Sequence, residues 1–315
     1  MFSQENDVLP YTLYKNKIVA FTDVGFNSAP FSIVDKFGKG VKKLQFKHNI
    51  RATLGLGIAY KWFALRIGFA LPGNLKAESK FGNTDYFDVG LKFNIKQVFT
   101  SINLRNYRGY VIKDEYKWND SLSSLTPNGI YPDIRTTNIS ANVWWFRSKD
   151  FNMHPVFGRV GHYTKAAKTW YFKTSLNFFG VSSPSSIISP IINDSTDRSN
   201  ASNIGAFDLG VIPGYAYVNR INNWQFAVFG GLGGVLQSKF YTHNTKTRSY
   251  LGIAPRVDLR LIGGYSKPSY FVLLTTNFDF KSVKIQHLKY NQSYYTIKLV
   301  AGVRIKTKSS KRKGS

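Results

Sequence analysis

The sequence predicts an all-β fold, a transmembrane antiparallel β-barrel of about twelve strands. The first observation is a strict alternation of large apolar residues with small or polar ones, which recurs along most of the chain. In residues 51–60, Leu56 and Ile58 fall on one face of an extended strand, whereas Gly55 and Gly57 fall on the other, because side chains alternate with a period of two. Residues 63–71 repeat the pattern. An apolar outer face and a small or polar inner face are typical of a barrel in a bilayer.

The second observation concerns hydropathy. No stretch of about eighteen consecutive apolar residues is present, so the sequence contains no candidate transmembrane helix. Contact with lipid would therefore require a closed barrel, because a bilayer tolerates no unpaired strand edge. The mean hydropathy of −0.23 is compatible with this fold, since half of each strand would face a polar interior.

The alternating runs place the strands in order along the chain. The first two runs are long, and the first is interrupted near residues 27–30. The run at 156–179 contains the sequence HYTKAAK, which breaks the alternation and predicts a kink, a bulge or an inward excursion. Strands are expected at residues 18–34, 43–60, 63–71, 86–94, 98–107, 135–146, 156–179, 206–218, 225–241, 250–264, 270–280 and 294–306.

The lengths of the connections are the third observation. Bacterial barrels have short periplasmic turns and long outer loops. The inner turns here are 60–62, 95–97, 147–155, 219–223 and 265–268, and the long outer loops are 72–85, 108–134 and 180–205. The pattern requires residues 156–179 to cross the membrane once; two crossings would change the strand count. We expect a periplasmic N-terminal segment (1–15), one barrel domain (16–306) and a disordered basic tail (307–315).

Composition limits the environment and the partners. The chain has 315 residues, 43 Lys and Arg against 17 Asp and Glu, a net charge of +26 and no cysteine. The charge indicates an anionic partner such as lipopolysaccharide, or it reflects basic loops in a lysine-rich proteome. The absence of cysteine excludes disulfides and thiolate metal sites. The first residues do not resemble an export signal, so the barrel interpretation implies a mature or truncated form.

Aromatic residues cluster near the expected strand ends. The runs Trp144–Phe146, Trp170–Phe172 and Tyr294–Tyr295 are the clearest. Tyr and Trp favour the boundary between membrane and water, so these runs predict an interfacial girdle. Ordinary β-propensity is the alternative explanation.

The alternation also predicts which charged residues face the lumen. The cluster Arg256, Asp258 and Arg260 is the clearest, because Val257 and Leu259 face outward between them. Charges at membrane depth are tolerated only toward an interior. They would form either a salt-bridged plug or an electropositive pore for anions. The candidate lumen residues are Arg51, Arg66, Asp88, Lys92, Arg105, Asp208, Arg256, Asp258, Arg260, Asp279, Lys298 and Arg304, with Lys173 in the wider inward set.

Evidence for catalysis is weak in the sequence. None of the five histidines forms an HExxH motif or a pair at ligand spacing, and only His162 lies in a strand region as a candidate for a Ser-His hydrolase. The GGLGG run at 230–234 lacks the features of a phosphate-binding loop. We therefore predict no catalytic residue, no metal and no cofactor. A soluble basic β-protein that binds nucleic acid is disfavoured, because aromatic and charged residues lie on opposite faces.

Three stretches resemble an uncharacterised Bacteroidota envelope family, a domain of unknown function. They are LGLGIAYKWFALRIGFALP at 54–72, the region from Tyr131-Pro132-Asp133-Ile134 to Trp145, and the region from Phe157 to Lys168. The resemblance extends over roughly residues 10–306 and implies an outer-membrane barrel made with a signal peptide. It implies no activity and assigns no functional residue.

The expected function is therefore a non-enzymatic outer-membrane β-barrel, with a narrow pore for small polar or anionic solutes as the first hypothesis. A plugged structural or assembly barrel is the alternative, and a barrel-type hydrolase is a further one. Expected partners are outer-membrane lipids and lipopolysaccharide, small anionic solutes and other envelope proteins, without nucleic acid.

Overall fold

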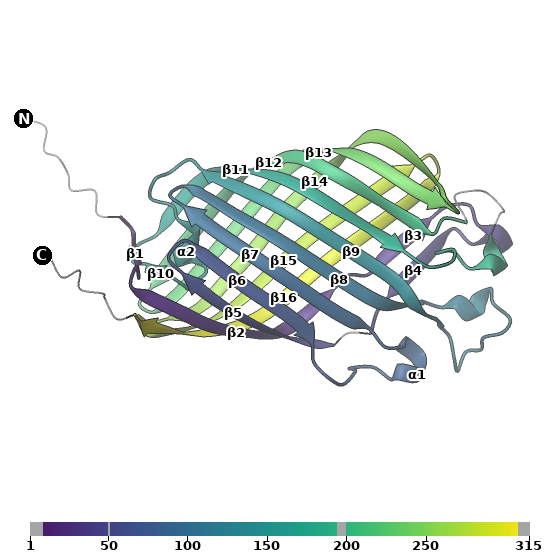
Figure 1. Cartoon of the computed structure of the whole chain (residues 1–315), viewed down its shortest axis with the longest axis horizontal. Helices are drawn as coiled ribbons and strands as arrows, with labels where there is room; N and C mark the ends of the chain where they lie inside the picture. The colour runs from purple at the N-terminus through teal and green to yellow at the C-terminus, as the bar shows by residue number, and fades with distance from the viewer. Residues whose placement is uncertain (1–8, 50, 194–199, 308–315) are drawn as a thin grey trace, which may run out of the picture.

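The computed structural model describes residues 9–49, 51–193 and 200–307. Twelve antiparallel strands form a closed ring in which the last strand pairs with the first, so the fold is the predicted transmembrane β-barrel (Figure 1). No helix in the described ranges is long and apolar enough to span a membrane. Around the ring the strands are β2 (Lys17–Ser28), β5 (Ala52–Tyr60), β6 (Phe63–Ala70), β7 (Asp85–Ile95), β8 (Val98–Ile112), β9 (Gly129–Phe146), β11 (Ala167–Ser182), β12 (Asn203–Ile221), β13 (Trp224–His243), β14 (Lys246–Ser266), β15 (Tyr270–Ile285) and β16 (Leu288–Lys306).

The two faces of the strands differ as the alternation predicts. On β5, Leu56 and Ile58 are 54% and 52% exposed on the outside, whereas Thr53 and Ala59 are buried inside. Every strand of the ring is paired on both sides over at least part of its length, which removes the strand edges that a bilayer excludes. The outer surface is therefore an apolar belt of the kind that faces lipid.

The end of the barrel where β2 begins and β16 ends is called here the terminus end (Figure 1). An aromatic girdle lies at this end. Trp145 and Trp170 are exposed there, as predicted, although their neighbours Trp144 and Tyr171 point inward. Tyr294 is also buried, so the predicted girdle is only partly confirmed. Further exposed aromatic residues near strand ends complete this girdle: Tyr60, Trp62, Tyr217, Trp224 and Tyr270.

Each of the first two predicted strands is in fact two strands. Residues 18–34 form β2 and β3 (Phe31–Val34), and residues 43–60 form β4 (Lys43–Lys47) and β5. Pro30 interrupts the first because proline cannot donate a ladder hydrogen bond. The backbone N–H of Ala29 is satisfied by His48 Nε2 at 2.9 Å. The ring still has twelve strands, because β3 and β4 do not cross the barrel and pair only with β16, with β8 and with each other.

The barrel is taller on one side than on the other. Strands β5 and β6 have 9 and 8 residues, whereas β13 and β14 have 20 and 21. Above the short strands, at the loop end, β3 pairs with β16 and β4 pairs with β8, which closes the wall there. Several strands extend further than the alternation predicted, so two of the long loops are shorter than expected, at 113–128 and 183–202. The third, at 71–84, has the expected length. The loop at 71–84 contains α1 (Glu78–Phe81).

Strands β14 and β15 separate toward the loop end. They pair only between Leu259–Ser266 and Phe271–Phe278. Beyond that point the side chains of Gln237 and Lys239 donate to the carbonyl oxygens of Ser282 and Lys284, at 3.1 and 3.3 Å. Side chains of β13 thus donate hydrogen bonds to backbone carbonyl groups of β15 that do not pair with β14.

The connection between β9 and β11 enters the barrel, so the predicted strand at 156–179 is wrong in its first part. Residues 147–166 contain α2 (Met153–Val156) and β10 (Gly161–Tyr163), and the crossing strand begins only at Ala167. The interpretation of this region as an inward excursion is correct. Residues 147–166 are called here the plug. The N-terminal strand β1 (Tyr11–Leu13) pairs with β10, so part of the expected N-terminal segment packs with the plug.

Two hydrophobic clusters fill the lumen from opposite ends. The terminus-end cluster combines plug residues such as Phe151 and Met153 with Phe229 and Phe271 from the wall, all buried. The loop-end cluster brings the 183–202 loop against the β3–β4 hairpin and the ends of β8, β15 and β16, and Ile187 in that loop is fully buried. The core of this barrel therefore consists of two apolar layers with a polar layer between them.

Candidate lumen site

A polar cavity of about 150 Å³ lies between the two hydrophobic clusters. Its walls come from inward faces of strands around the ring and from the plug. The outward-facing Val257 and Leu259 of β14 also line it, next to the point where β14 and β15 separate. Eight of the lining residues are basic and four are acidic. The charged lining residues are Asp23, Arg66, Asp88, Lys92, Arg105, Arg159, Lys173, Arg256, Asp258, Arg260, Asp279 and Lys298.

Arg66 connects three strands through two carboxylates. Its guanidinium donates to both oxygens of Asp23 and to Asp88, with 2.7 Å from Nη2 to Asp23 Oδ1. Two glycines make this pairing possible, because a Cβ at Gly55 or at Gly68 would overlap the guanidinium or its carboxylate partners. The small residues on the inner face of β5 and β6 therefore provide space for an ion-pair network.

Asp258 is the second centre of the network. It accepts hydrogen bonds from Lys173 Nζ at 2.9 Å, Tyr171 Oη at 3.0 Å and Trp144 Nε1 at 3.3 Å. These donors come from β9 and β11, whereas Asp258 lies on β14. A buried carboxylate with a cation and two further donors is well compensated, as ion pairs at this depth must be.

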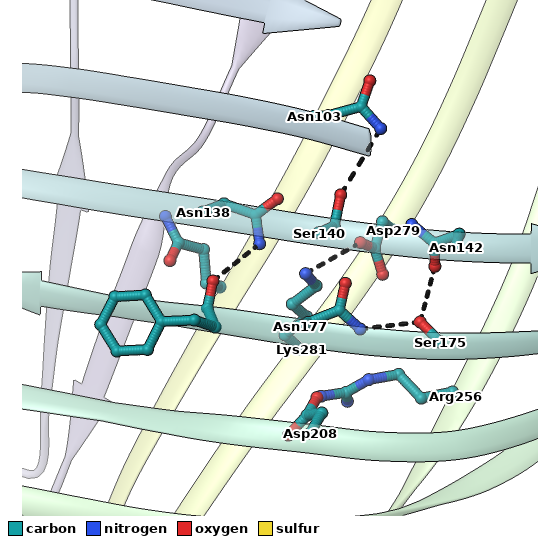
Figure 2. Close-up of polar contacts among 12 residues, drawn as sticks. Asn103, Asn138, Ser140, Asn142, Ser175, Asn177, Asp208, Arg256, Asp279 and Lys281 are labelled. Atoms are coloured by element: carbon teal, nitrogen blue, oxygen red, sulfur yellow. Dashed lines mark hydrogen bonds and ion pairs between the residues drawn. The ribbon is translucent and has the colours of Figure 1, made fainter. Parts of the chain in front are cut away.

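A third group lies toward the loop end (Figure 2). Arg256 pairs with Asp208, which also accepts from Gln237 Nε2 at 2.9 Å. Lys281 Nζ lies 3.5 Å from Asp279 Oδ2.

A row of amides and hydroxyls crosses the wall beside this group (Figure 2). Asn177 Nδ2 donates to Ser175 Oγ at 2.7 Å, and that hydroxyl donates to Asn142 Oδ1 at 2.6 Å. Neighbouring β8 and β9 contribute Asn103 and Ser140. The polar inner face is therefore a connected network rather than isolated groups.

Four cationic side chains have no carboxylate partner among the described residues: Lys92, Arg105, Arg159 and Arg260. Three of them surround the ring of Phe157, a plug residue. Lys92 Nζ lies 3.9 Å from the ring centroid, and the Cζ atoms of Arg159 and Arg260 lie at 5.3 and 5.7 Å. Arg159 Nε is buried and makes no hydrogen bond.

Most of the lumen residues expected from the alternation lie at this cavity. Three do not. Arg51 lies at the loop-end rim and donates to Asn74 Oδ1 at 2.8 Å, because β5 begins only at residue 52. Asp208 is fully buried beside Arg256 and outside the cavity lining. Arg304 lies at the terminus end, where it donates to backbone carbonyls of the plug, including Arg159 O at 2.9 Å.

Three members of the network were not expected from the sequence. Asp23 was hidden because Phe21 also points inward, so β2 has apolar residues on both faces near that point. Lys281 lies in the part of β15 beyond the predicted strand end at 280. Arg159 lies in the irregular plug, where no periodicity assigns a direction to a side chain.

The histidines are structural in this arrangement. His48 Nε2 accepts the Ala29 N–H, and Ser28 Oγ lies 3.1 Å from the same nitrogen. Because Nε2 already accepts a backbone proton, it is poorly placed to activate the serine. Burial lowers the pKa of His48 to about 4. His162, the sequence candidate, has Tyr14 Oη 2.5 Å from Nδ1 in the plug. No group of three potential metal ligands occurs in the described ranges.

The fold and the lumen together define a class of protein: a twelve-stranded transmembrane β-barrel with a plugged lumen. Residues 11–304 match the model of a family described as a domain of unknown function, DUF4421, and the chain belongs to that family. Among curated proteins, none matches the chain.

Solved structures of other barrels are similar only at low identity. The outer membrane protease OmpT of Escherichia coli is 9% identical, with coverage of 95% of this chain and 99% of that chain and a TM-score of 0.41. The translocator domain of the autotransporter NalP of Neisseria meningitidis is 9% identical, with coverage of 92% and 88% and a TM-score of 0.43. The P. putida toluene transporter TodX is 6% identical, with coverage of 92% and 90% and a TM-score of 0.29.

Proposed function

We propose that this protein is a plugged, non-enzymatic β-barrel of a bacterial outer membrane that is closed to solutes in the conformation described. The observation that carries the proposal is the filling of the lumen from both ends. The terminus-end and loop-end clusters are each built from buried side chains, and the space between them is a polar cavity of about 150 Å³.

The apolar belt and the aromatic girdle support the membrane location. The outer face of the barrel is apolar and its inner face is charged. In water an exposed apolar surface of this extent would favour association. The terminus end would be periplasmic, as in bacterial barrels generally. The resemblance of residues 54–72 to Bacteroidota envelope proteins supports an origin in that group.

We propose no catalytic role, because the candidate residues are buried or engaged with structural partners. His48 and His162 are each engaged with a structural partner, and His154 lies buried in the plug. The lumen aspartates are paired with cations. General acid–base catalysis requires a titratable group within reach of a substrate, and these groups are enclosed.

A gated pore for small polar or anionic solutes is the second candidate. It is favoured by the polar, cation-rich middle layer, since a purely structural barrel could fill this layer with apolar side chains at lower cost. The plug is anchored by few hydrogen bonds from the wall, mainly from Gln225 and Arg304. Such a plug could move as a unit while the wall stays closed.

The proposed partners are outer-membrane lipids, lipopolysaccharide and other envelope proteins. The net charge of +26 favours anionic headgroups and phosphates. No nucleic acid is proposed, because the basic residues of the lumen are enclosed and cannot contact a polymer.

Planar-bilayer recordings of the purified barrel test this proposal. The plugged barrel is expected to show no steady conductance and only brief openings. A stable open-channel conductance in every incorporated molecule would contradict the plugged conformation and favour an open pore. Heat-modifiable mobility on gels should be checked in the same preparation, because a protein that stays soluble without detergent would contradict the membrane location.

A further inference from the structure

Basic side chains outnumber acidic ones around the central cavity, with eight basic and four acidic residues in its lining. Each lumen aspartate already has a cation: Asp23 and Asp88 share Arg66, Asp258 pairs with Lys173, Asp208 with Arg256 and Asp279 with Lys281. Lys92, Arg105, Arg159 and Arg260 form no direct ion pair with a carboxylate in the described part of the chain.

Burying several unpaired cations together is energetically costly. A charge removed from water loses its hydration, and like charges repel one another in a medium of low dielectric constant. Contact with the Phe157 ring offsets only part of this cost. An anion bound among these side chains would relieve the repulsion.

The geometry offers a place for that anion. Lys92 from β7, Arg260 from β14 and Arg159 from the plug approach Phe157 from three different elements. All three line the cavity, together with Arg105. Arg260 donates from Nε to Asn277 Oδ1 at 2.8 Å, which fixes the guanidinium. Its two terminal nitrogens make no hydrogen bond within the described ranges.

We propose that this cavity is a binding site for a small oxyanion of the phosphate or sulfate class, held by Lys92, Arg159, Arg260 and Arg105. The proposal rests on the closed lumen described above and adds to it a ligand that the lumen encloses. Guanidinium groups match the geometry of tetrahedral oxyanions, because their N–H groups donate in pairs.

The size and the polarity of the cavity define the ligand further. A cavity of about 150 Å³ has room for one small oxyanion together with water molecules. The amides and hydroxyls of Asn103, Ser140 and Asn142 also line the cavity and can bind the accompanying water.

The test is retention of radiolabelled inorganic phosphate by the full chain. The protein is refolded into a phosphate-free detergent with increasing concentrations of labelled phosphate, and the folded barrel is separated by gel filtration. Refolding gives the anion access before the lumen closes and excludes lipopolysaccharide as a source of phosphate. We expect about one phosphate per folded barrel at saturation.

Two variants decide whether the phosphate lies in the cavity. Lys92→Met with Arg260→Met removes two of the cations, and we expect at least tenfold weaker retention, about 1.4 kcal/mol. Lys168→Met is the matched control, because Lys168 is exposed on the outer face of β11. If the double variant fails to acquire heat-modifiable mobility, Lys92→Gln alone provides the comparison.

The outcomes separate this inference from the proposed function. Unlabelled sulfate should displace the label, whereas chloride at the same concentration should not. Folded wild-type protein without bound phosphate, equal retention by the lumen variant, or equal displacement by chloride would each overturn the site. None of these results bears on the closed conformation, which the conductance measurement tests separately.

Discussion

Arg66 is the residue on which the inner ion-pair network depends most. It neutralises Asp23 and Asp88 at once, and both carboxylates are almost fully buried. Lys298 lies 3.7 Å from Asp23 and offers only a weaker alternative. A single guanidinium therefore neutralises one carboxylate on β2 and one on β7, which would otherwise be unpaired negative charges in the lumen.

Replacing Arg66 should destabilise the barrel strongly. Arg66→Met leaves two buried carboxylates without their cation, and we expect a loss of about 3–5 kcal/mol in the free energy of unfolding. Denaturant titration in lipid vesicles, followed by intrinsic fluorescence, measures it. The matched control adds Asp23→Asn and Asp88→Asn to the same chain. If this triple variant recovers no stability, the effect of Arg66 is due to packing rather than to charge.

His48 provides a pH-dependent contribution outside the membrane-spanning strands. Burial lowers the pKa of His48 to about 4 from an ordinary value of 6.5, because the protonated ring would lose its hydration. A proton on Nε2 would also face the Ala29 N–H that this atom accepts. The unfolded chain therefore binds a proton more readily than the folded barrel between these two pH values.

Stability should decrease as the pH falls from about 6.5 toward 4, by up to about 1.4 kcal/mol per pH unit from this group. His48→Asn should reduce that slope, measured as the difference in unfolding free energy between pH 7 and pH 4.5. His287→Asn, on an exposed turn, is the control that removes a histidine elsewhere. An unchanged slope in His48→Asn would show that other groups dominate.

At the scale of elements, the plug of residues 147–166 fills the terminus end of the lumen. Gln225 holds α2 by donating to the carbonyls of Pro155 and Val156, at 2.8 and 3.0 Å, and accepts from Tyr163 N at 3.1 Å. Arg304 holds the segment after α2 through the carbonyls of Gly158 and Arg159. These two wall residues connect the plug to β13 and β16.

Removing both side chains should loosen the plug, which then keeps the hydrogen bond from Met153 N to Asn94 Oδ1 of β7 at 3.1 Å. Each buried hydrogen bond contributes about 1 kcal/mol, and those to a charged group contribute more. We expect Gln225→Ala with Arg304→Ala to raise the frequency of channel openings in planar bilayers at least tenfold, which corresponds to about 1.4 kcal/mol.

The control for this experiment is Gln237→Ala, because Gln237 is an equally buried glutamine of β13 that contacts Asp208 and β15 instead of the plug. Equal openings in the control would show general loosening of the barrel. Silence in both variants would favour the purely structural alternative over a gated pore.

At the scale of the whole molecule, the barrel reverses the usual distribution of polarity. The apolar belt and the girdle face outward, and the charged network lies inside between two apolar layers. Trp144 and Trp145 illustrate the reversal, since they are adjacent in sequence and 2% and 44% exposed. Only a surrounding lipid phase makes this distribution favourable.

Tryptophan quenching tests the membrane placement. Variants that retain only Trp170 or only Trp144, with the other tryptophans replaced by Phe, are refolded into vesicles containing lipids brominated along the acyl chain near the headgroup. We expect strong quenching of Trp170, which is 58% exposed in the girdle, and little quenching of Trp144 inside the barrel. Similar quenching of the two would contradict the assigned direction of β9 and β11.

The alternation alone determined the fold class, the number of ring strands and most of the lumen residues. A period of two is a local property of the chain, so Arg66 and the cluster around Asp258 could be assigned to the inner face before any pairing was known. The same reasoning failed at residues 156–166, where an irregular segment has no period to follow. It also failed at Asp23, because Phe21 and Val24 place apolar residues on both faces of β2.

Only the tertiary structure decided that two apolar clusters fill the ends of the lumen and which charges are paired. The plug, the 183–202 loop and the β3–β4 hairpin fill the barrel through contacts between segments far apart in sequence. Charge pairing across the lumen depends on strand register around the whole ring, which no single strand encodes. The unpaired cations around Phe157 became visible only after each aspartate had been assigned its partner.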